Sequence, residues 1–245
     1  MRILLAEDNV VNQKLAVHLL GQMGYRPDVV ANGLEVLRSL ERQPYDVILM
    51  DVQMPEMDGI EATRVIRSPE SRVLDHGVRI IALTAHAMKG DKERCLEAGM
   101  DDYLSKPIRL DELKRVIECS TFVSSCIAQE TAPREDGKVF DRAAVLKRLG
   151  GDGAFLTDLL SLCLREMPRQ IAALSDALAA KDLTRLEREA HSLKGAADNV
   201  GALGLRAAAL DMEMAARRGD LENAPALLSR IGDAFALFQR CLHNT

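Results

Sequence analysis

Short apolar segments alternate with amphipathic ones over the first 118 residues of the chain. The clearest apolar segment, 45–51, lies between Pro44 and Pro55; it is too short for a helix and too apolar for a half-exposed strand. It is typical of a strand buried on both faces, as in a parallel sheet. Similar strands are predicted at 3–6, 27–31, 79–83 and 102–105. Helices are predicted at 10–23, 33–40, 58–67, 88–98 and 110–119. This alternation predicts an α/β doubly wound five-stranded parallel sheet with helices on both faces.

The second half of the chain shows helical periodicity alone. Helices are predicted at 140–149, 152–167, 171–180, 183–200, 203–218 and 225–242. Asp152 is expected to cap its helix, and Pro168 to kink that helix or to open the next one. Short polar connections between such helices predict an all-α antiparallel bundle. Residues 119–138, polar and without a period, indicate a linker, so the predicted domains are 1–118 and 139–245.

The composition is that of a globular protein, with 47% apolar and 28% charged residues and a net charge of −5. Neither half is basic and aromatic residues are few, which argues against nucleic-acid binding. The five Cys show neither metal-ligand nor disulfide spacing, so we expect a reduced, cytoplasmic compartment. No apolar run is long enough to span a membrane, and direct membrane insertion is not expected. Because Met1 leads directly into the first strand, we expect either a whole protein or the end of a longer one.

Charged and polar residues lie at the carboxyl ends of four predicted strands. Glu7 and Asp8 follow the first strand, Asp51 ends the third, Thr84 follows the fourth and Lys106 the fifth. In open parallel sheets ligands bind at this edge, so we expect these side chains to converge. Carboxylates with a Lys and a Thr suit a hard cation and a phosphoryl group. Each acid alone is more often a helix cap or a solvated loop residue, but their joint occurrence favours a site.

The chemistry that such a site favours is transfer of a phosphoryl group to the carboxylate of Asp51. We expect oxygen ligands for Mg²⁺ (or Mn²⁺) at this edge: Asp8, Asp51, the main-chain carbonyl of Gln53 and, through water, Glu7. Lys106 and Thr84 are expected to take up the charge of the phosphoryl oxygens. The metal and Lys106 both favour the ionised state that Asp51 needs for attack.

Four motifs of this region resemble those of the receiver (response-regulator) domain of two-component signalling, in order and in spacing. They are L-A-E-D-N at 5–9, M-D-V-Q-M-P-E-M-D-G at 50–59, A-L-T-A at 82–85 and Y-L-S-K-P at 103–107. The resemblance covers about residues 1–118 and implies a flavodoxin-like receiver fold. It implies Asp51 as phosphoacceptor, the acidic pair at 7 and 8 as metal ligands, and Thr84 and Lys106 as phosphate contacts. It also implies that Tyr103 swings inward when Thr84 engages the phosphate, although Tyr103 by itself is an ordinary strand aromatic. A cis peptide bond between Lys106 and Pro107 is expected by the same resemblance.

In the predicted bundle, one His has neighbours that suit phosphoryl transfer. The 183–200 helix has a seam of apolar residues at steps of three and four: Leu186, Ala190, Leu193, Ala197 and Val200. His191 lies off this seam and is expected to be exposed, with Lys194 and Gly195 one turn away on its own face. Neutral imidazole is a nucleophile at physiological pH, Lys194 attracts a phosphate, and Gly195 leaves room for another protein. A lone surface His is, however, more often a solvated residue.

The segment 190–202, A-H-S-L-K-G-A-A-D-N-V-G-A, closely resembles the histidine phosphotransfer (HPt) motif. This resemblance implies an HPt-like bundle in which His191 is the phosphohistidine, supported by Lys194 and Gly195. Together the two resemblances favour a two-component phosphorelay protein, similar to the C-terminal part of a hybrid sensor histidine kinase. The implied partners are a histidine kinase core that feeds Asp51 and a downstream response-regulator receiver that exchanges phosphate with His191. If the chain is part of a membrane sensor kinase, it is expected to lie at the inner face of the membrane.

The sequence leaves other functions open. The main alternative is a receiver that acts as a phosphate sink, or as a phosphorylation-switched binding module with the bundle as its docking domain. An aspartyl phosphatase usually carries a second Asp two residues past the nucleophile as general acid. This chain has Gln53 there, which argues against that function. A flavodoxin-like cofactor binder is disfavoured because no phosphate-cradling loop follows the first strand. The sequence shows no ATP-binding kinase domain, so the chain is not expected to start a relay from ATP.

Overall fold

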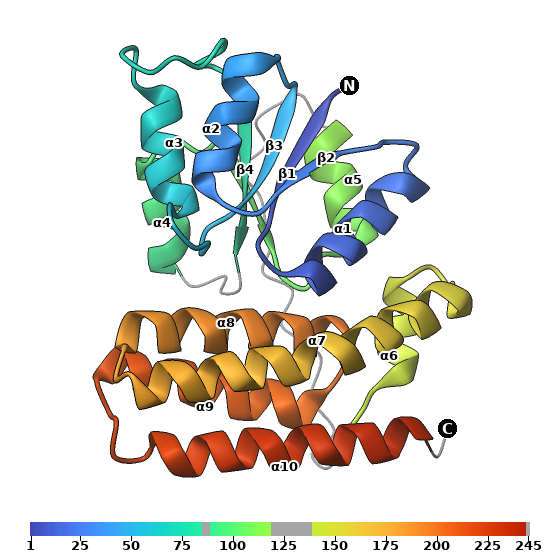
Figure 1. Cartoon of the computed structure of the whole chain (residues 1–245). Helices are drawn as coiled ribbons and strands as arrows, with labels where there is room; N and C mark the ends of the chain where they lie inside the picture. Colours follow the sequence, from blue (N-terminus) through green and yellow to red (C-terminus); the bar gives the residue numbers. More distant parts are fainter. Residues whose placement is uncertain (85–88, 119–138, 244–245) are drawn as a thin grey trace. The chain divides into compact units, whose positions relative to one another are not determined.

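The computed structural model describes residues 1–84, 89–118 and 139–243, and the chain divides into two compact units, Met1–Ala132 and Pro133–Thr245 (Figure 1). The predicted linker at 119–138 and the last residue of the motif at 82–85 lie outside the described residues. The predicted domain limits at 118 and 139 stay predictions.

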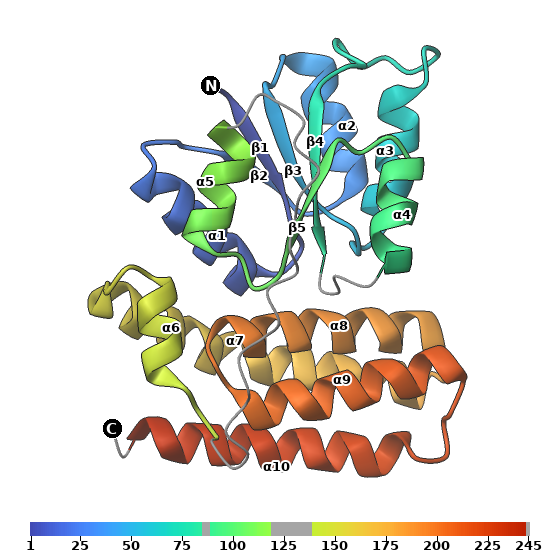
Figure 2. The same ribbon diagram turned by 180° about the vertical axis from the view of Figure 1, so that it is seen from behind.

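The first unit is a five-stranded parallel sheet between two layers of helices, as predicted. Its strands, in the spatial order β2-β1-β3-β4-β5, are β1 (Ile3–Ala6), β2 (Asp28–Val30), β3 (Val47–Asp51), β4 (Arg79–Thr84) and β5 (Asp102–Ser105). Its helices are α1 (Val10–Gln22), α2 (Gly33–Arg42), α3 (Gly59–Arg67), α4 (Lys89–Glu97) and α5 (Leu110–Glu118). Helices α1 and α5 cover one face of the sheet, and α2, α3 and α4 cover the other (Figures 1 and 2).

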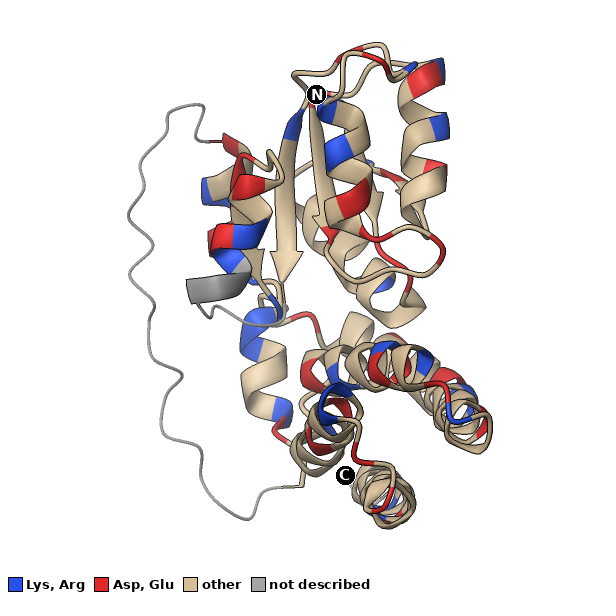
Figure 3. Ribbon diagram, turned by 90° about the vertical axis from the view of Figure 1, so that its left-hand side faces the viewer, with Lys and Arg blue, Asp and Glu red and all other residues tan. Residues whose placement is uncertain are grey.

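The burial of the central strands explains their continuous apolar sequences. Every residue of β1 and β3 is buried, because a parallel sheet with helices on both faces has no solvent side. Figure 3 shows that charged residues are concentrated on the helices and loops and are scarce on the strands. The strand register pairs Ala6 with Met50 and Asp51 with Leu83. The carboxyl ends of β1, β3 and β4 therefore meet at one edge of the sheet.

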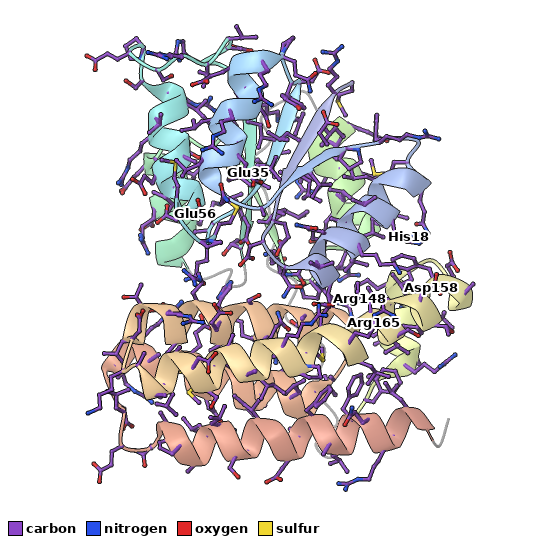
Figure 4. All side chains as sticks on the ribbon, viewed as in Figure 1. His18, Glu35, Glu56, Arg148, Asp158 and Arg165 are labelled. Carbon is purple, nitrogen blue, oxygen red and sulfur yellow. The ribbon has the colours of Figure 1, made fainter. Side chains whose placement is uncertain are left out.

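Polar caps fix where the helices at this edge begin. Asn9, Asn32 and Asp58 cap α1, α2 and α3 by accepting hydrogen bonds from main-chain N–H groups of the first turn. Asn32 also donates its amide to Oε1 of Glu56 at 3.5 Å. Glu56, labelled in Figure 4, lies in the loop after β3. The loop that follows Asp51 is thus tied to the loop that follows β2.

Gly59, the first residue of α3, is expected to be required for the shape of this edge. A Cβ added there would lie 2.1 Å from the main-chain oxygen of Asp51, so Gly59→Ala has to displace the end of β3. We expect the free energy of unfolding of this unit to fall by about 2 kcal/mol, as measured by urea denaturation.

The matched control for this substitution is Gly204→Ala, in the first turn of α9 (Leu203–Arg218). The added Cβ would meet nothing within 4 Å, so the helix is expected to keep its stability or to gain up to about 1 kcal/mol. Equal losses of stability in the two variants would contradict this account of Gly59.

The second unit is an all-α antiparallel bundle, as predicted. A short helix, α6 (Arg142–Arg148), precedes α7 (Gly153–Ala179), α8 (Leu183–Asn199), α9 and α10 (Ala224–His243). Helix α8 packs between α7 and α9, and α10 packs against both α7 and α9. The four long helices therefore form a closed bundle, seen along its axis in Figure 3.

Pro168 lies inside one continuous helix, so the prediction of separate helices at 152–167 and 171–180 is wrong. A proline removes one helical hydrogen bond, but the side chain of Pro168 is exposed and its ring meets solvent. Met167 and Leu174, buried on either side of it, anchor both halves of α7 in the bundle core. Tertiary packing on both sides of Pro168 therefore keeps α7 continuous.

The first helix of this unit begins at Arg142, two residues later than the sequence predicts. Phe140 instead pairs with Ala202 in an isolated antiparallel bridge. Its ring packs edge-on against Phe238 of α10, with 5.5 Å between ring centroids. The segment before α6 therefore packs against the turn between α8 and α9 and against α10.

Candidate functional sites

The acidic residues at the edge of the sheet form one cluster. Glu7 and Asp8 follow β1 and Asp51 ends β3, and one carboxylate oxygen of each lies within 4.8 Å of the others. Glu7 and Asp51 are buried and Asp8 is half-buried. Oxygen ligands so close together fit a divalent cation, because the cation offsets the repulsion among the carboxylates. The cluster can therefore hold a metal ion.

Lys106 joins two of these acids. Its Nζ lies 2.6 Å from Oε2 of Glu7 and 2.6 Å from Oδ2 of Asp51. Burial alone would lower the pKa of Lys106, but the charges of Asp51 and Glu7 raise it above its usual value. Burial, and then the charge of Glu7, raise the pKa of Asp51 well above its usual value, and Lys106 only partly opposes them. A further cation at the cluster would therefore favour the ionised form of Asp51.

Thr84 and Gln53 lie beside this cluster. Thr84 is buried at the end of β4, and its main-chain oxygen accepts a hydrogen bond from the N–H of Lys106 at 2.7 Å. Gln53 donates its main-chain N–H to Oδ1 of Asp51 at 3.3 Å. Within the described part of the chain, the buried Oε1 of Gln53 has no hydrogen-bond partner. The phosphate contact of Thr84 and the metal contact of the Gln53 carbonyl stay predictions.

Tyr103 lies on β5 and is half-buried. The Nζ of Lys92 in α4 lies 4.6 Å from the centre of its ring, a cation–π contact. The inward swing that the receiver resemblance implies for Tyr103 stays a prediction. The expected cis peptide bond between Lys106 and Pro107 is present.

His191 lies on α8, but it is not exposed as the sequence indicated. Only 11% of its side chain is exposed, because the ring packs against α9, where its Nδ1 lies 3.0 Å from Oε1 of Glu213. Lys194 is also buried, and its Nζ lies 2.6 Å from Oε2 of Glu213. Lys194 Nζ also lies 3.5 Å from Nδ1 of His191, so Glu213 bridges two residues that already lie side by side on α8. Gly195 is half-buried, and its role in admitting a partner stays a prediction.

The sequence alone did not identify Glu213 as a site residue. This carboxylate on α9 is buried and also accepts a hydrogen bond from Arg217 Nη2 at 2.8 Å. A signal existed: Glu213 falls among buried apolar residues such as Met212 and Ala216, where a carboxylate is costly unless it is paired. Its partner, His191, could not be predicted from the sequence, because the contact between α8 and α9 depends on how the two helices pack.

The charges around Glu213 select one form of the His191 ring. Burial alone would raise the pKa of Glu213, but its hydrogen bond with His191, the charge of His191 and the charge of Lys194 lower it to about 2. Glu213 is therefore ionised at neutral pH and accepts a hydrogen bond from Nδ1–H. In the neutral ring this leaves the lone pair on Nε2. Burial lowers the pKa of Lys194, and the charge of Glu213 opposes this shift.

Comparisons with known proteins cover both units. The family model of the response regulator receiver domain matches residues 3–118, and that of the Hpt domain matches residues 158–242. The chain is 33% identical over 234 residues to the sensor histidine kinase GacS of Pseudomonas protegens, covering 92% of this chain and 25% of that protein. It is 43% identical over 123 residues to hybrid signal transduction histidine kinase K of Dictyostelium discoideum, covering 48% of this chain and 10% of that protein.

A solved structure is also similar to the first unit. It is the receiver domain of sensor histidine kinase PA1611 from Pseudomonas aeruginosa, with a coordinated magnesium ion; it is 51% identical and covers 48% of this chain and 93% of its own, with a TM-score of 0.44. The chain spans a quarter or less of the length of the two kinases. Among the described helices, none has the length and apolar character needed to cross a membrane. The acidic cluster lies within the receiver match and His191 within the Hpt match, and the chain therefore belongs to the two-component phosphorelay proteins, as a receiver domain followed by an Hpt domain.

Proposed function

We propose that the chain carries a phosphoryl group at two residues, Asp51 of the receiver domain and His191 of the Hpt domain. The contact of Lys106 with both Glu7 and Asp51 carries this proposal. A buried cation held at 2.6 Å from Asp51 provides positive charge where a phosphoryl group on that carboxylate needs it. A structural ion pair alone would not require a third carboxylate, that of Asp8, within 4.8 Å of the two acids that Lys106 contacts.

The metal that suits the acidic cluster is Mg²⁺, or Mn²⁺ in its place, because both prefer oxygen ligands. We assign its ligands as Asp8, Asp51, the main-chain carbonyl of Gln53 and, through water, Glu7. The bound ion supplies positive charge to the phosphoryl oxygens and to Asp51. The outer position of Glu7 is supported by its two hydrogen-bond donors, one on each oxygen, Asn12 and Lys106.

In the receiver domain, an oxygen of ionised Asp51 attacks the phosphorus of a phosphohistidine on the partner kinase core. An O–P bond forms and the P–N bond breaks, and the departing imidazole nitrogen keeps the electron pair of that bond. Lys106 and Thr84 bind phosphoryl oxygens as charge spreads over them in the transition state. Because Lys106 is already held beside Asp51, it needs no reorganisation at that moment.

In the Hpt domain, Nε2 of His191 attacks the phosphorus of an aspartyl phosphate on a receiver domain. An N–P bond forms, the O–P bond breaks, and the receiver carboxylate leaves with the electron pair. The positive charge that develops on the imidazole lies against the ionised Glu213, which accepts the hydrogen bond from Nδ1–H. The reverse reaction uses the same contacts, so His191 exchanges phosphate in either direction.

The partners that fit this chemistry are a histidine kinase core and a downstream response-regulator receiver. The chain spans a quarter or less of its kinase relatives, so we place the kinase core in another part of the parent protein or in a separate chain. Phosphate passes from that core to Asp51 and from Asp51 to His191 of the same or another chain, and His191 exchanges it with the downstream receiver.

The test of the first site is labelling of the full chain with ³²P-acetyl phosphate and Mg²⁺. We expect an alkali-labile label that disappears with Asp51→Asn and when EDTA removes the metal. Asp58→Asn is the matched control, because Asp58 is exposed on the same loop and Asn also caps a helix. A label that survives in the Asp51→Asn chain would show that another residue accepts the phosphoryl group.

A further inference from the structure

Asn12 in the first turn of α1 contacts the acidic cluster from outside the set of predicted ligands. We infer that Asn12 is a positioning residue for the metal site, because it fixes the carboxylate of Glu7; this inference rests on the proposed function. Asn12 is buried, and its Nδ2 donates a hydrogen bond to Oε1 of Glu7 at 2.7 Å. The main chain at this position is also held, since the main-chain N–H of Asn12 donates a hydrogen bond to Oδ1 of the cap residue Asn9 at 3.3 Å.

The two oxygens of Glu7 are divided between two donors of different kinds. Oε1 accepts from the neutral amide of Asn12, and Oε2 accepts from the charged Nζ of Lys106 at 2.6 Å. Each oxygen keeps a second lone pair for a metal-bound water. Lys106 competes with a cation for the negative charge of Glu7, whereas the neutral amide orients the carboxylate without a competing charge.

The orientation that Asn12 imposes on the Glu7 carboxylate matters most for a small cation with a strict coordination geometry. A Glu side chain has three rotatable torsions, and loss of the Asn12 donor allows its carboxylate to turn. Mg²⁺ requires nearly ideal octahedral geometry, whereas Ca²⁺ accepts flexible and irregular ligand sets. Outer-sphere partners that orient metal ligands contribute about 10- to 100-fold to metal affinity in general. The loss of Asn12 is therefore expected to weaken Mg²⁺ binding more than Ca²⁺ binding.

The neighbouring residue supplies a matched control. Gln13 also donates a hydrogen bond to Glu7, from Nε2 at 2.6 Å, but to the main-chain oxygen and not to the carboxylate. Asn12→Leu and Gln13→Leu thus each remove one side-chain amide that donates to Glu7, and both amides come from the first turn of α1. They differ in whether the donor contacts the group that faces the metal.

The experiment is calorimetric titration of the full chain with Mg²⁺ and, separately, with Ca²⁺. For Asn12→Leu we expect the Kd for Mg²⁺ to rise about 10-fold and the Kd for Ca²⁺ about 3-fold or less. For Gln13→Leu we expect both values to stay within about 2-fold of wild type. An Asn12→Leu chain with the wild-type Kd for Mg²⁺, or with equal weakening for both ions, would overturn the inference.

A second measurement needs no substitution and covers the case in which Asn12→Leu does not fold. In ¹⁵N NMR spectra of the wild-type chain, the side-chain amide signals of Asn12 are expected to shift on addition of Mg²⁺, with the calorimetric Kd. Signals that do not move while the ion binds would overturn the inference. A wild-type chain that binds no Mg²⁺ would instead overturn the proposed function of the cluster.

Discussion

A chain with Lys106→Met is expected to bind Mg²⁺ at least as tightly as wild type and yet to accept phosphate at Asp51 roughly 100-fold more slowly. In the wild-type chain Lys106 forms ion pairs with Glu7 and Asp51, the same two acids that would interact with a metal ion. Its removal frees negative charge for the ion, while the phosphoryl oxygens lose a positive charge in the transition state. Calorimetry gives the affinity for Mg²⁺, and initial rates of labelling with acetyl phosphate give the rate of phosphorylation.

The control for this variant is Lys114→Met, which removes an exposed Lys from α5 of the same domain. It is expected to change neither quantity. The opposite split, with Mg²⁺ binding lost and the rate at saturating Mg²⁺ unchanged, would mean that Lys106 holds the metal site together and does not act on the phosphoryl group. The electrostatic role argued for Lys106 would then be wrong.

A chain with Glu213→Leu is expected to accept phosphate at His191 roughly 100-fold more slowly, whereas Glu213→Gln is expected to lose roughly 10-fold. Leu has no acceptor for the Nδ1–H of His191, so the ring is no longer held with its lone pair on Nε2. Gln keeps an acceptor oxygen but loses the charge that balances the imidazole. Because the pKa of Glu213 lies at about 2, the carboxylate is ionised throughout the neutral range in which the rates are measured.

The donor for these rates is a full-length His191→Gln chain, labelled at Asp51 and freed of acetyl phosphate. The acceptors are full-length Asp51→Asn chains with and without the change at Glu213. Glu187→Gln is the matched control, since Glu187 contacts the outer side of Arg217 at 2.6 Å and not the His191 ring. Equal rates for Glu213→Leu and Glu187→Gln, with similar thermal stability, would show that Glu213 is only structural.

The receiver site could be predicted from sequence because its geometry follows from strand order. Strands buried on both faces leave continuous apolar segments, and a parallel sheet brings their carboxyl ends to one edge. Strand order therefore places Glu7, Asp8, Asp51 and Lys106 at one edge, where their side chains meet. The role of Asn12 could not be predicted, because it depends on which rotamer reaches Glu7.

The Hpt site could be predicted only in part, because its second half comes from another helix. The apolar seam of α8 locates His191 and Lys194 on one helix, but the pairing of α8 with α9 is set by side-chain packing across the bundle. That pairing delivers Glu213 to His191 and buries a ring that was expected to be exposed. The continuous helix through Pro168 could not be predicted for a related reason, since the burial of residues on both sides of the proline outweighs the hydrogen bond that it removes.

The central claim, that His191 exchanges phosphate with a receiver aspartate, is tested most directly by mixing two full-length chains. One carries His191→Gln and is labelled at Asp51, and the other carries Asp51→Asn and is unlabelled. The account predicts that the alkali-labile label on the first chain decays as an acid-labile, alkali-stable label appears on the second. Loss of the label from the first chain to water alone, with none on the second, would contradict the account and favour a phosphate sink.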